Sequence, residues 1–287
     1  MNYVLRHGVM RFLGDFEPSP AVAYARGQQV IARTERGLEV GEILCDASPR
    51  ALELLPEKTT GQILRPLSDE DRDHILRLNE REEHAFFKCK EFIESRKLQM
   101  ELVDVEQLFG GERIIFYFLA EKRVDFRELV KDLAREYRTR IEMRQIGVRD
   151  EAKLLADYGD CGKPVCCNTH MAVMPPVSMR MAKLQKSTLD PSKISGRCGR
   201  LKCCLRFEQD VYEEFQQELP PIGGRVVTAK GQGRVLAQEI LARKLLVEFE
   251  DGRRLVVGID EVLTHLNPPR NDGRPAKSDS RPPTPDS

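Results

Sequence analysis

The sequence lacks an excess of charge of either sign and any long apolar run. Its 46 basic and 46 acidic side chains leave no net charge at pH 7, so bulk charge does not indicate a large nucleic-acid footprint, although local basic faces would be compatible with this balance. The first residues, MNYVLRHGVMRFLGD, contain no apolar core of signal-peptide length, and no later run approaches a membrane span. We therefore expect a soluble, cytoplasmic protein.

Recognisable catalytic and nucleotide-binding patterns are also missing. The sequence has no Ser-His-Asp or Cys-His pairing, and no pair of carboxylates stands in a context that indicates an enzyme mechanism. The segment KGQGRV at residues 230–235 matches neither GxxxxGK[ST] nor a GxGxxG that follows a strand, so its glycines favour turns of a barrel. The segment GGERIIFYF lacks the RNP1 spacing, and we expect Phe116, Tyr117 and Phe118 to pack in a core. We predict a protein that is not an enzyme.

The patterns that are present predict an α+β fold with several parts. Residues 1–58 contain short alternating segments broken by glycine and proline, which are typical of a β meander. Residues 59–147 read as a strand (GQILRPL), a long helix with Ser68 as N-cap, two strands joined by Gly110-Gly111, a second amphipathic helix and a closing strand (RIEMRQI). The order β-α-β-β-α-β predicts a ferredoxin-like domain.

The remaining residues divide into three predicted segments. Residues 148–219 are rich in cysteine and poor in strand patterning, with one short helix expected at about residues 178–186. In residues 220–266, apolar strands alternate with KGQG and EDGRR, which indicates a small SH3-like barrel similar to KOW-type modules. Residues 267–287 are rich in proline and charge with almost nothing apolar, so we expect them to be disordered.

One basic run allows two interpretations. The run RTRIEMRQIGVR, residues 138–149, could contact phosphate groups through outward-facing arginines. The alternative is a strand whose exposed face pairs with neighbouring acids such as Glu142 and Asp150, and this second interpretation is favoured.

The cysteines are the most informative feature of the chain. Six of the eight fall in two matching stretches, CGKPVCC at residues 161–167 and CGRLKCC at residues 198–204. In a reducing compartment, clustered cysteines are more often metal ligands or redox thiols than disulfides. The glycine after the first cysteine of each stretch lets the backbone curl. Of the other two cysteines, Cys89 falls on the apolar face of a predicted helix, which indicates packing, whereas Cys45 is uninformative.

The chemistry of the two cysteine triplets is compatible with several kinds of site. Side chains of adjacent cysteines diverge, so a tetrahedral zinc site would take one thiolate from each pair and use Cys161, Cys166, Cys198 and Cys203. A [4Fe-4S] cluster spreads its ligands more widely and can recruit either member of a pair. A second cluster would then need His170 or a ligand from a partner chain. Reversible redox thiols or buried, unliganded cysteines are the remaining alternatives.

Longer motifs carry a resemblance to a known family. The stretches FYFLAEKRVDFRELVKDLA, RIEMRQIGVRDEAK, CGKPVCC, PVSMRMAKLQ and LDPSKISGRCGRLKCCLRFE occur in this order between about residues 61 and 207. Together they resemble the bacterial YaaT/RicT family, whose members carry a polymerase-suppressor (PSP-type) C-terminal domain. One departure lies before Cys161, where this chain has LLADYGD and the family tends to have a pair of glycines.

This resemblance implies a non-catalytic subunit of a cytoplasmic regulatory complex. Some family members join two small helical partners of the YlbF/YmcA type, carry [4Fe-4S] clusters and are linked to ribonuclease Y-dependent RNA maturation and to sporulation, competence and biofilm decisions. The resemblance favours iron–sulfur over zinc and implies as candidate ligands Cys161, Cys166, Cys167, Cys198, Cys203 and Cys204. The alternative hypothesis is a zinc-stapled module that binds nucleic acid, RNA in particular, through its C-terminal barrel.

Overall fold

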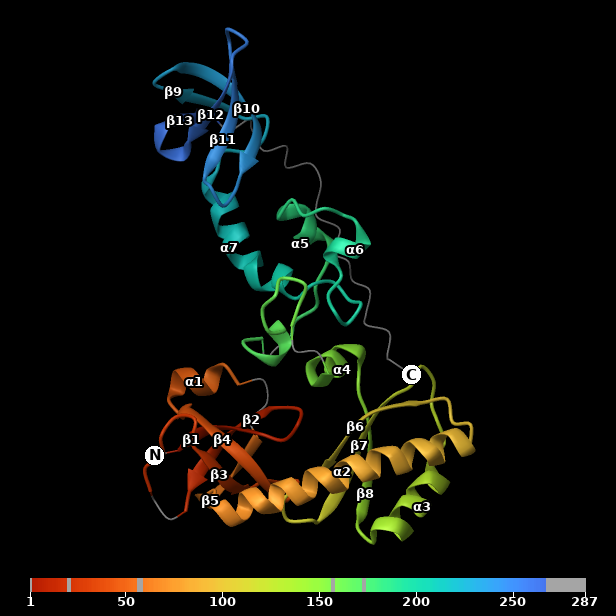
Figure 1. The fold of residues 1–287 in the computed structure, drawn as a ribbon. Coiled ribbons are helices and arrows are strands. Elements are labelled where there is room, and N and C mark those ends of the chain that lie inside the picture. Colours follow the sequence, from red (N-terminus) through yellow and green to blue (C-terminus); the bar gives the residue numbers. More distant parts are fainter. Residues whose placement is uncertain (1, 20–21, 56–58, 156–157, 172–173, 267–287) are drawn as a thin grey trace. The chain divides into compact units, whose positions relative to one another are not determined.

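The computed structural model describes residues 2–19, 22–55, 59–155, 158–171 and 174–266 (Figure 1). The fold is mixed α+β and divides into two compact units, one comprising Met1–Met179 with Thr188–Cys204 and the other Arg180–Ser187 with Leu205–Ser287. The tail at residues 267–287, which the sequence predicts to be disordered, lies outside the described residues. Within the described part of the chain, every helix is too short or too polar to cross a bilayer.

The N-terminal part of the first unit is a closed five-stranded β barrel. Its strands are β1 (Tyr3–His7), β2 (Phe12–Pro18), β3 (Gln29–Arg33), β4 (Leu38–Asp46) and β5 (Thr59–Pro66), in the order β1-β2-β5-β3-β4. A short helix, α1 (Pro49–Glu53), follows β4, and Ser48 caps it. The barrel core consists of buried residues from all five strands and the β2–β3 connection: Tyr3, Leu5, Phe16, Tyr24, Val30, Ala32, Ile43 and Ile63.

The place of β5 corrects the predicted ferredoxin-like arrangement. The segment GQILRPL forms a strand as predicted, but it pairs parallel with β2 and antiparallel with β3 inside the barrel. This pairing closes the barrel and removes two strand edges that would otherwise be open. Gly61 allows the close approach, because a Cβ there would collide with the carbonyl oxygen of Arg33 and the ring of Phe16. Alternation of apolar residues therefore identified the strand but not its partners, which lie far away in the sequence.

A three-stranded sheet and two helices make up the next part of the same unit. The elements are α2 (Asp69–Ser95), β6 (Glu101–Gln107), β7 (Arg113–Leu119), α3 (Arg127–Tyr137) and β8 (Arg140–Gln145). Strand β7 lies in the centre, antiparallel to β6 and parallel to β8. The predicted cap is confirmed, because Ser68 Oγ accepts a hydrogen bond from Asp71 N (3.3 Å) and Asp71 Oδ2 accepts one from Ser68 N (2.8 Å).

Both faces of the three-stranded sheet are covered, and the predicted core residues are confirmed. On one face Phe116 packs with Cys89 of α2 and Leu129 of α3. On the other face Tyr117 packs with Met10 from the β1–β2 turn. Phe116, Tyr117 and Phe118 are at most 3% exposed, so these aromatic rings are not available to stack on bases.

The cysteine-rich segment is more helical than the sequence predicts. It contains α4 (Val148–Leu155), the 3-10 turn η1 (Cys166–Asn168), α5 (Met179–Leu184), α6 (Pro191–Ile194) and α7 (Cys204–Glu218). Helix α5 confirms the one short helix expected there. Helix α7 was missed, although Leu205, Tyr212 and Phe215 recur at helical spacing, and Tyr212 and Phe215 pack against the core of the C-terminal sheet.

The C-terminal strands are those predicted, but they form an open sheet. They are β9 (Arg225–Thr228), β10 (Gly231–Glu239), β11 (Lys244–Phe249), β12 (Arg254–Gly258) and β13 (Val262–Leu266), with the short turn η2 (Ile259–Glu261) before β13. All pairs are antiparallel in the order β12-β11-β10-β9-β13, and in the described residues β12 and β13 do not pair to close a barrel. The glycines of KGQG lie at the β9–β10 turn and in β10, as expected.

Candidate functional site

The first cysteine triplet begins in a tight turn. Gly159 N donates a hydrogen bond to Lys163 O (2.8 Å), and Gly162 N donates one to Gly159 O (3.0 Å). Gly162, directly after Cys161, has φ +74°, a left-handed conformation that favours glycine. The predicted curling of the backbone after the first cysteine is therefore confirmed for this triplet.

The second triplet repeats this turn bond for bond. Gly196 N donates to Arg200 O (2.8 Å), Gly199 N donates to Gly196 O (2.9 Å), and Gly199 has φ +72°. Gly159 and Gly196 thus belong to the repeat, which is Gly-x-Cys-Gly-basic in both copies. The pairs GDCGK and GRCGR in the sequence were the signal for this longer repeat.

Polar contacts join the two turns to each other. Asp160 in the first turn lies 3.3 Å from the ammonium group of Lys202 and 4.0 Å from the guanidinium group of Arg197, both in the second triplet region. Arg197 Nε also donates a hydrogen bond to Tyr158 O (3.2 Å). The two matching turns are therefore neighbours within one compact unit.

The thiols of both triplets share one electrostatic environment. A hydrogen bond joins the thiols of Cys166 and Cys203. Burial, followed by the neighbouring thiols of Cys203, Cys204 and Cys161, raises the pKa of Cys166 to about 12. Burial also raises the pKa of Cys167, with further contributions from Cys203 and Cys198. The thiols of the two triplets thus act on one another electrostatically, and a bound cation would oppose this rise in the thiol pKa values.

The six triplet cysteines supply thiol donors, whose chemistry suits a thiolate-bound group. Cys161 is exposed and the other five triplet cysteines are partly buried. Among the residues that the structure describes, no three His, Cys, Asp or Glu side chains already converge closely enough to hold a single metal ion. His170 is exposed and its Nδ1 lies 3.0 Å from Thr169 Oγ1. Cys89 is fully buried in the core, where burial raises its pKa to about 12.

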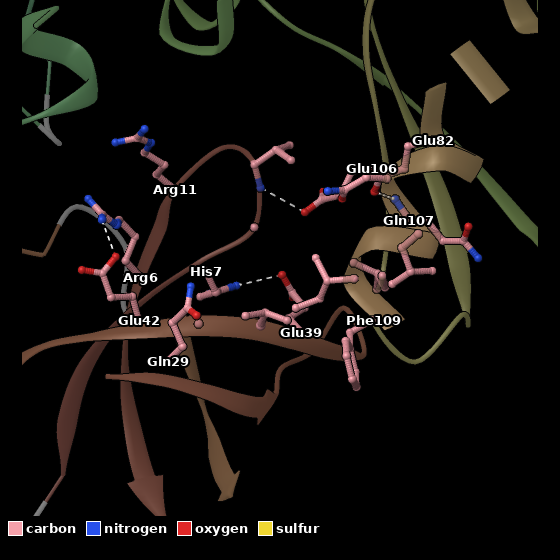
Figure 2. Close-up of a pocket in the computed structure, with 18 residues that line it drawn as sticks. Arg6, His7, Arg11, Gln29, Glu39, Glu42, Glu82, Glu106, Gln107 and Phe109 are labelled. Carbon is pink, nitrogen blue, oxygen red and sulfur yellow. Dashed lines mark hydrogen bonds and ion pairs between the residues drawn. The ribbon is translucent and has the colours of Figure 1, made fainter. Parts of the chain in front are cut away.

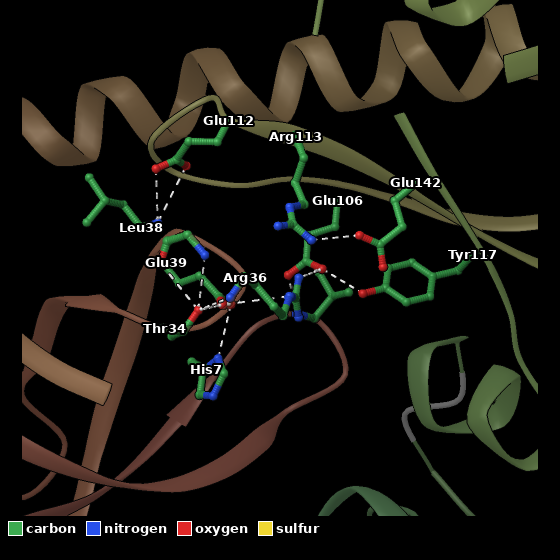
Figure 3. Close-up of polar contacts among 12 residues, drawn as sticks. His7, Thr34, Arg36, Leu38, Glu39, Glu106, Glu112, Arg113, Tyr117 and Glu142 are labelled. Carbon is green, nitrogen blue, oxygen red and sulfur yellow. Dashed lines mark hydrogen bonds and ion pairs between the residues drawn. The ribbon is translucent and has the colours of Figure 1, made fainter. Parts of the chain in front are cut away.

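A second polar cluster, which the sequence did not indicate, connects the barrel to the three-stranded sheet (Figure 3). Glu106 in β6 accepts hydrogen bonds from Val9 N (3.1 Å) and the Tyr117 hydroxyl (2.6 Å), and it pairs with the guanidinium group of Arg36. Arg36 Nε also lies 3.7 Å from Glu39 Oε1. Burial and the adjacent Glu106 raise the pKa of Tyr117, so its hydroxyl remains a donor.

A cavity of about 380 Å³ opens beside this cluster (Figure 2). His7 and Glu39 line it from the barrel, and the His7 Nδ1 and Glu39 Oε2 atoms are 3.0 Å apart. Burial acts to raise the pKa of Glu39, but the interactions with His7, Arg36 and Thr34 together outweigh it and lower this pKa. Glu82 lines the opposite side from α2, where its carboxylate accepts a hydrogen bond from Gln107 N (2.6 Å).

Glu82 provides a pH-dependent contribution to stability. Burial, and then the nearby carboxylates of Asp104 and Glu106, raise its pKa from 4.5 to about 7. Because the folded-state pKa exceeds the unfolded value, the protonated form stabilises the fold fully below about pH 4.5, and this contribution is lost as the pH rises through 7.

The Glu82→Gln variant is therefore expected to be more stable than the parent at pH 8, by about 1–3 kcal/mol after screening is allowed for, and nearly equal to it at pH 5. Urea unfolding at the two pH values measures this difference. Glu83→Gln, at an exposed position on the same helix, is the control, and an equal response of the two variants would contradict the account of Glu82.

Two family models match this chain. Residues 61–146 match the PSP1 C-terminal conserved region, and residues 176–219 match the third domain of PSP1-like proteins. The first match covers β5 through Ile146, and the second covers α5, α6, the second cysteine triplet and α7. No solved structure shows significant similarity to the chain.

Two curated proteins are similar in sequence. The chain is 44% identical over 232 residues to the stage 0 sporulation protein YaaT of Bacillus subtilis, a match that covers 79% of this chain and 82% of that protein. It is also 38% identical over 82 residues to an uncharacterized protein of Schizosaccharomyces pombe, covering 29% of this chain and 11% of the yeast protein.

Proposed function

The chain belongs to the YaaT/PSP1-type family, and from this premise we propose that it is a non-catalytic regulatory protein whose two cysteine triplets together bind an iron–sulfur cluster. The observation that carries the proposal is the pair of matching turns, joined through Asp160, which hold Cys161 and Cys198, together with the electrostatic interactions between the thiols of the two triplets. The name of the Bacillus relative, a stage 0 sporulation protein, supports a regulatory rather than an enzymatic role.

The number of thiols favours a cluster over a single zinc ion. A closed zinc site would use Cys161, Cys166, Cys198 and Cys203 and would leave Cys167 and Cys204 without a role. Yet the pKa of Cys167 responds to Cys203 and Cys198, and that of Cys166 responds to Cys204. Both members of each cysteine pair therefore belong to the same group of thiols, which suits a cluster that can recruit either member of a pair.

The proposed role of the cysteine segment is to organise a surface for partner proteins. A [4Fe-4S] group, when bound, supplies oxygen- and redox-sensitive ligation, and a group that binds only the folded segment stabilises that segment by mass action. The chain's own turns position the thiols, while Lys163 and Arg200 follow the first Cys-Gly of each triplet and offset part of the thiolate charge. We place the protein in the cytoplasm, with small helical proteins of the YlbF/YmcA type as partners and ribonuclease Y as an indirect one.

Partner binding under controlled oxygen exposure tests this function. Size-exclusion chromatography of anaerobically prepared protein with purified YlbF/YmcA-type partners is expected to give a complex that largely dissociates after exposure to air. The matched control is the same complex kept anaerobic for the same time. A complex of equal stability in both samples would contradict the proposed dependence of assembly on the cluster. Steep salt-dependent binding of RNA by the isolated chain would instead favour the zinc-stapled nucleic-acid module.

A further inference from the structure

A second cavity, of about 280 Å³, is lined by an excess of cationic side chains. It lies among the β1–β2 turn, the end of β8 and helix α4, all in the first compact unit. Among the described residues that line it, three are cations, Arg11, Arg144 and Lys153, and one is a carboxylate, Asp150. In the described part of the chain none of these three cations takes part in an ion pair. The cavity therefore has about two positive charges in excess.

The two arginines are held in place by contacts other than carboxylates. The guanidinium carbon of Arg144 lies 5.1 Å from the centre of the Phe12 ring, which also lines the cavity. Arg11 Nη1 donates a hydrogen bond to the carbonyl oxygen of Asn168 (3.3 Å). Lys153 is partly buried, and this burial lowers its pKa although Asp150 and Cys167 act in the opposite direction. Positive charge is thus concentrated at a partly enclosed site, where an anion would stabilise it.

The backbone at Arg11 shows that the fold itself does not require an arginine there. Arg11 closes the β1–β2 turn through a hydrogen bond from its N to Gly8 O (3.0 Å), and its φ is +54°. This left-handed conformation costs a residue with a Cβ about 1 kcal/mol relative to glycine. The side chain is exposed at the rim of the cavity, where it is free to contribute to binding rather than to packing.

We propose that this cavity binds a phosphate group, either as free phosphate or as the phosphate of a small phosphomonoester. A dianion matches the two excess positive charges, and its oxygens accept the charge-assisted hydrogen bonds that guanidinium and ammonium groups donate. The cavity volume is at the small end of ligand pockets, which suits a phosphate with at most a small organic group. The carboxylate of Asp150 can accept a hydrogen bond from the P–OH group of monohydrogen phosphate, a donor that sulfate lacks, so the site is expected to prefer free phosphate to sulfate.

The proposed phosphate site lies next to the cysteine site but uses different side chains. Asn168, whose carbonyl oxygen contacts Arg11, ends the η1 turn that contains Cys166 and Cys167. The phosphate contacts themselves involve no thiol. Phosphate binding therefore does not require the triplets to bind iron, and failure of one proposal leaves the other standing.

Isothermal titration calorimetry on the full chain with inorganic phosphate tests the proposal. The Arg11→Gly variant is expected to weaken phosphate binding about tenfold or more and to remain folded, because glycine suits the left-handed backbone. Arg138→Gly is the matched control, since Arg138 is also left-handed (φ +48°) and exposed but lies at the end of α3, outside the cavity. Lys153→Gln is expected to weaken binding similarly while Arg138→Gly leaves it unchanged.

Parallel titrations identify the source of the phosphate group. Binding of inorganic phosphate without adenosine 5′-monophosphate assigns the site to the free ion, and tighter binding of the nucleotide assigns it to a phosphorylated small molecule. Equal binding of adenosine and its monophosphate would overturn the proposal, as would equal phosphate binding by Arg11→Gly and Arg138→Gly, or no phosphate binding at all. Binding of a 5′-hydroxyl RNA that Arg11→Gly weakens, without phosphate binding, would assign the cations to an RNA backbone and would likewise overturn it.

Discussion

Anaerobically prepared Cys198→Ser protein is expected to lose most of its iron and sulfide and to become locally unstable around the two cysteine turns. Serine offers a harder, poorly ionised oxygen in place of a soft thiolate, and iron–sulfur clusters select thiolates. Cys198 follows Gly196 in the second turn and contributes to the environment of Cys167, so its loss affects both triplets. The barrel and the three-stranded sheet, which have their own cores, are expected to stay folded.

Iron and sulfide analysis and limited proteolysis measure these two effects. The matched control is Cys45→Ser, because Cys45 is exposed in β4 and belongs to neither triplet. Its iron content and its protease resistance are expected to equal those of the parent. An unchanged iron content in Cys198→Ser would remove this residue from the proposed ligand set.

Replacing Arg36 with alanine is expected to lower the free energy of unfolding by about 3–5 kcal/mol. The substitution leaves Glu106 without its cationic partner and leaves Glu39 with His7 but without Arg36, although the two carboxylate side chains are only 7% and 3% exposed. An uncompensated buried carboxylate costs far more than the loss of an exposed ion pair. Arg36 also lies over the Phe12 ring of β2, 5.2 Å from its centre, so this cation–π contact within the barrel is lost as well.

Urea unfolding of Arg36→Ala and Arg6→Ala tests whether the loss of stability is specific to the buried cluster or follows the removal of any paired arginine. Arg6 pairs with Glu42 at 2.5 Å in the same barrel, but both side chains are about one-third exposed. Arg6→Ala is therefore expected to cost at most about 1 kcal/mol. If the two variants lost the same stability, the buried cluster of Figure 3 would not be what couples the barrel to the sheet.

Local patterns predicted many individual elements correctly. Ser68 was identified as a helix cap, Cys89 and Phe116 as core residues, and Gly110-Gly111 as the hairpin turn, where Gly111 has φ +74°. Each of these features depends on residues a few positions apart, on a single apolar face or on one backbone conformation. Such signals are contained in a short stretch of sequence.

The arrangement of these elements depended on contacts that no short stretch contains. Strand β5 pairs with β2 and β3 across large separations in sequence, so its apolar alternation fitted two different sheets equally well. Arg36 and Glu106 are 70 positions apart, and each alone looks like an ordinary surface charge. Only the fold shows that Glu106 is buried, that Arg36 is half-buried and that the two are paired.

The candidate cysteine site depends both on local sequence signals and on contacts between residues far apart in the sequence. The repeated spacing and the glycine after each first cysteine were readable from the sequence, and the structure confirms the turns. The contacts of Asp160 with Lys202 and Arg197 were not readable, because the residues belong to different copies of the repeat. Our proposal for the bound group rests on the interactions between thiols of both copies of the repeat, which the spacing alone does not show.

Quantitative iron, sulfide and zinc analysis of the full chain prepared without oxygen tests the central claim most directly. The account predicts a brown protein that contains iron and acid-labile sulfide in equal amounts and little zinc, and that loses its colour in air. A colourless protein with one zinc ion per chain and no sulfide would contradict it.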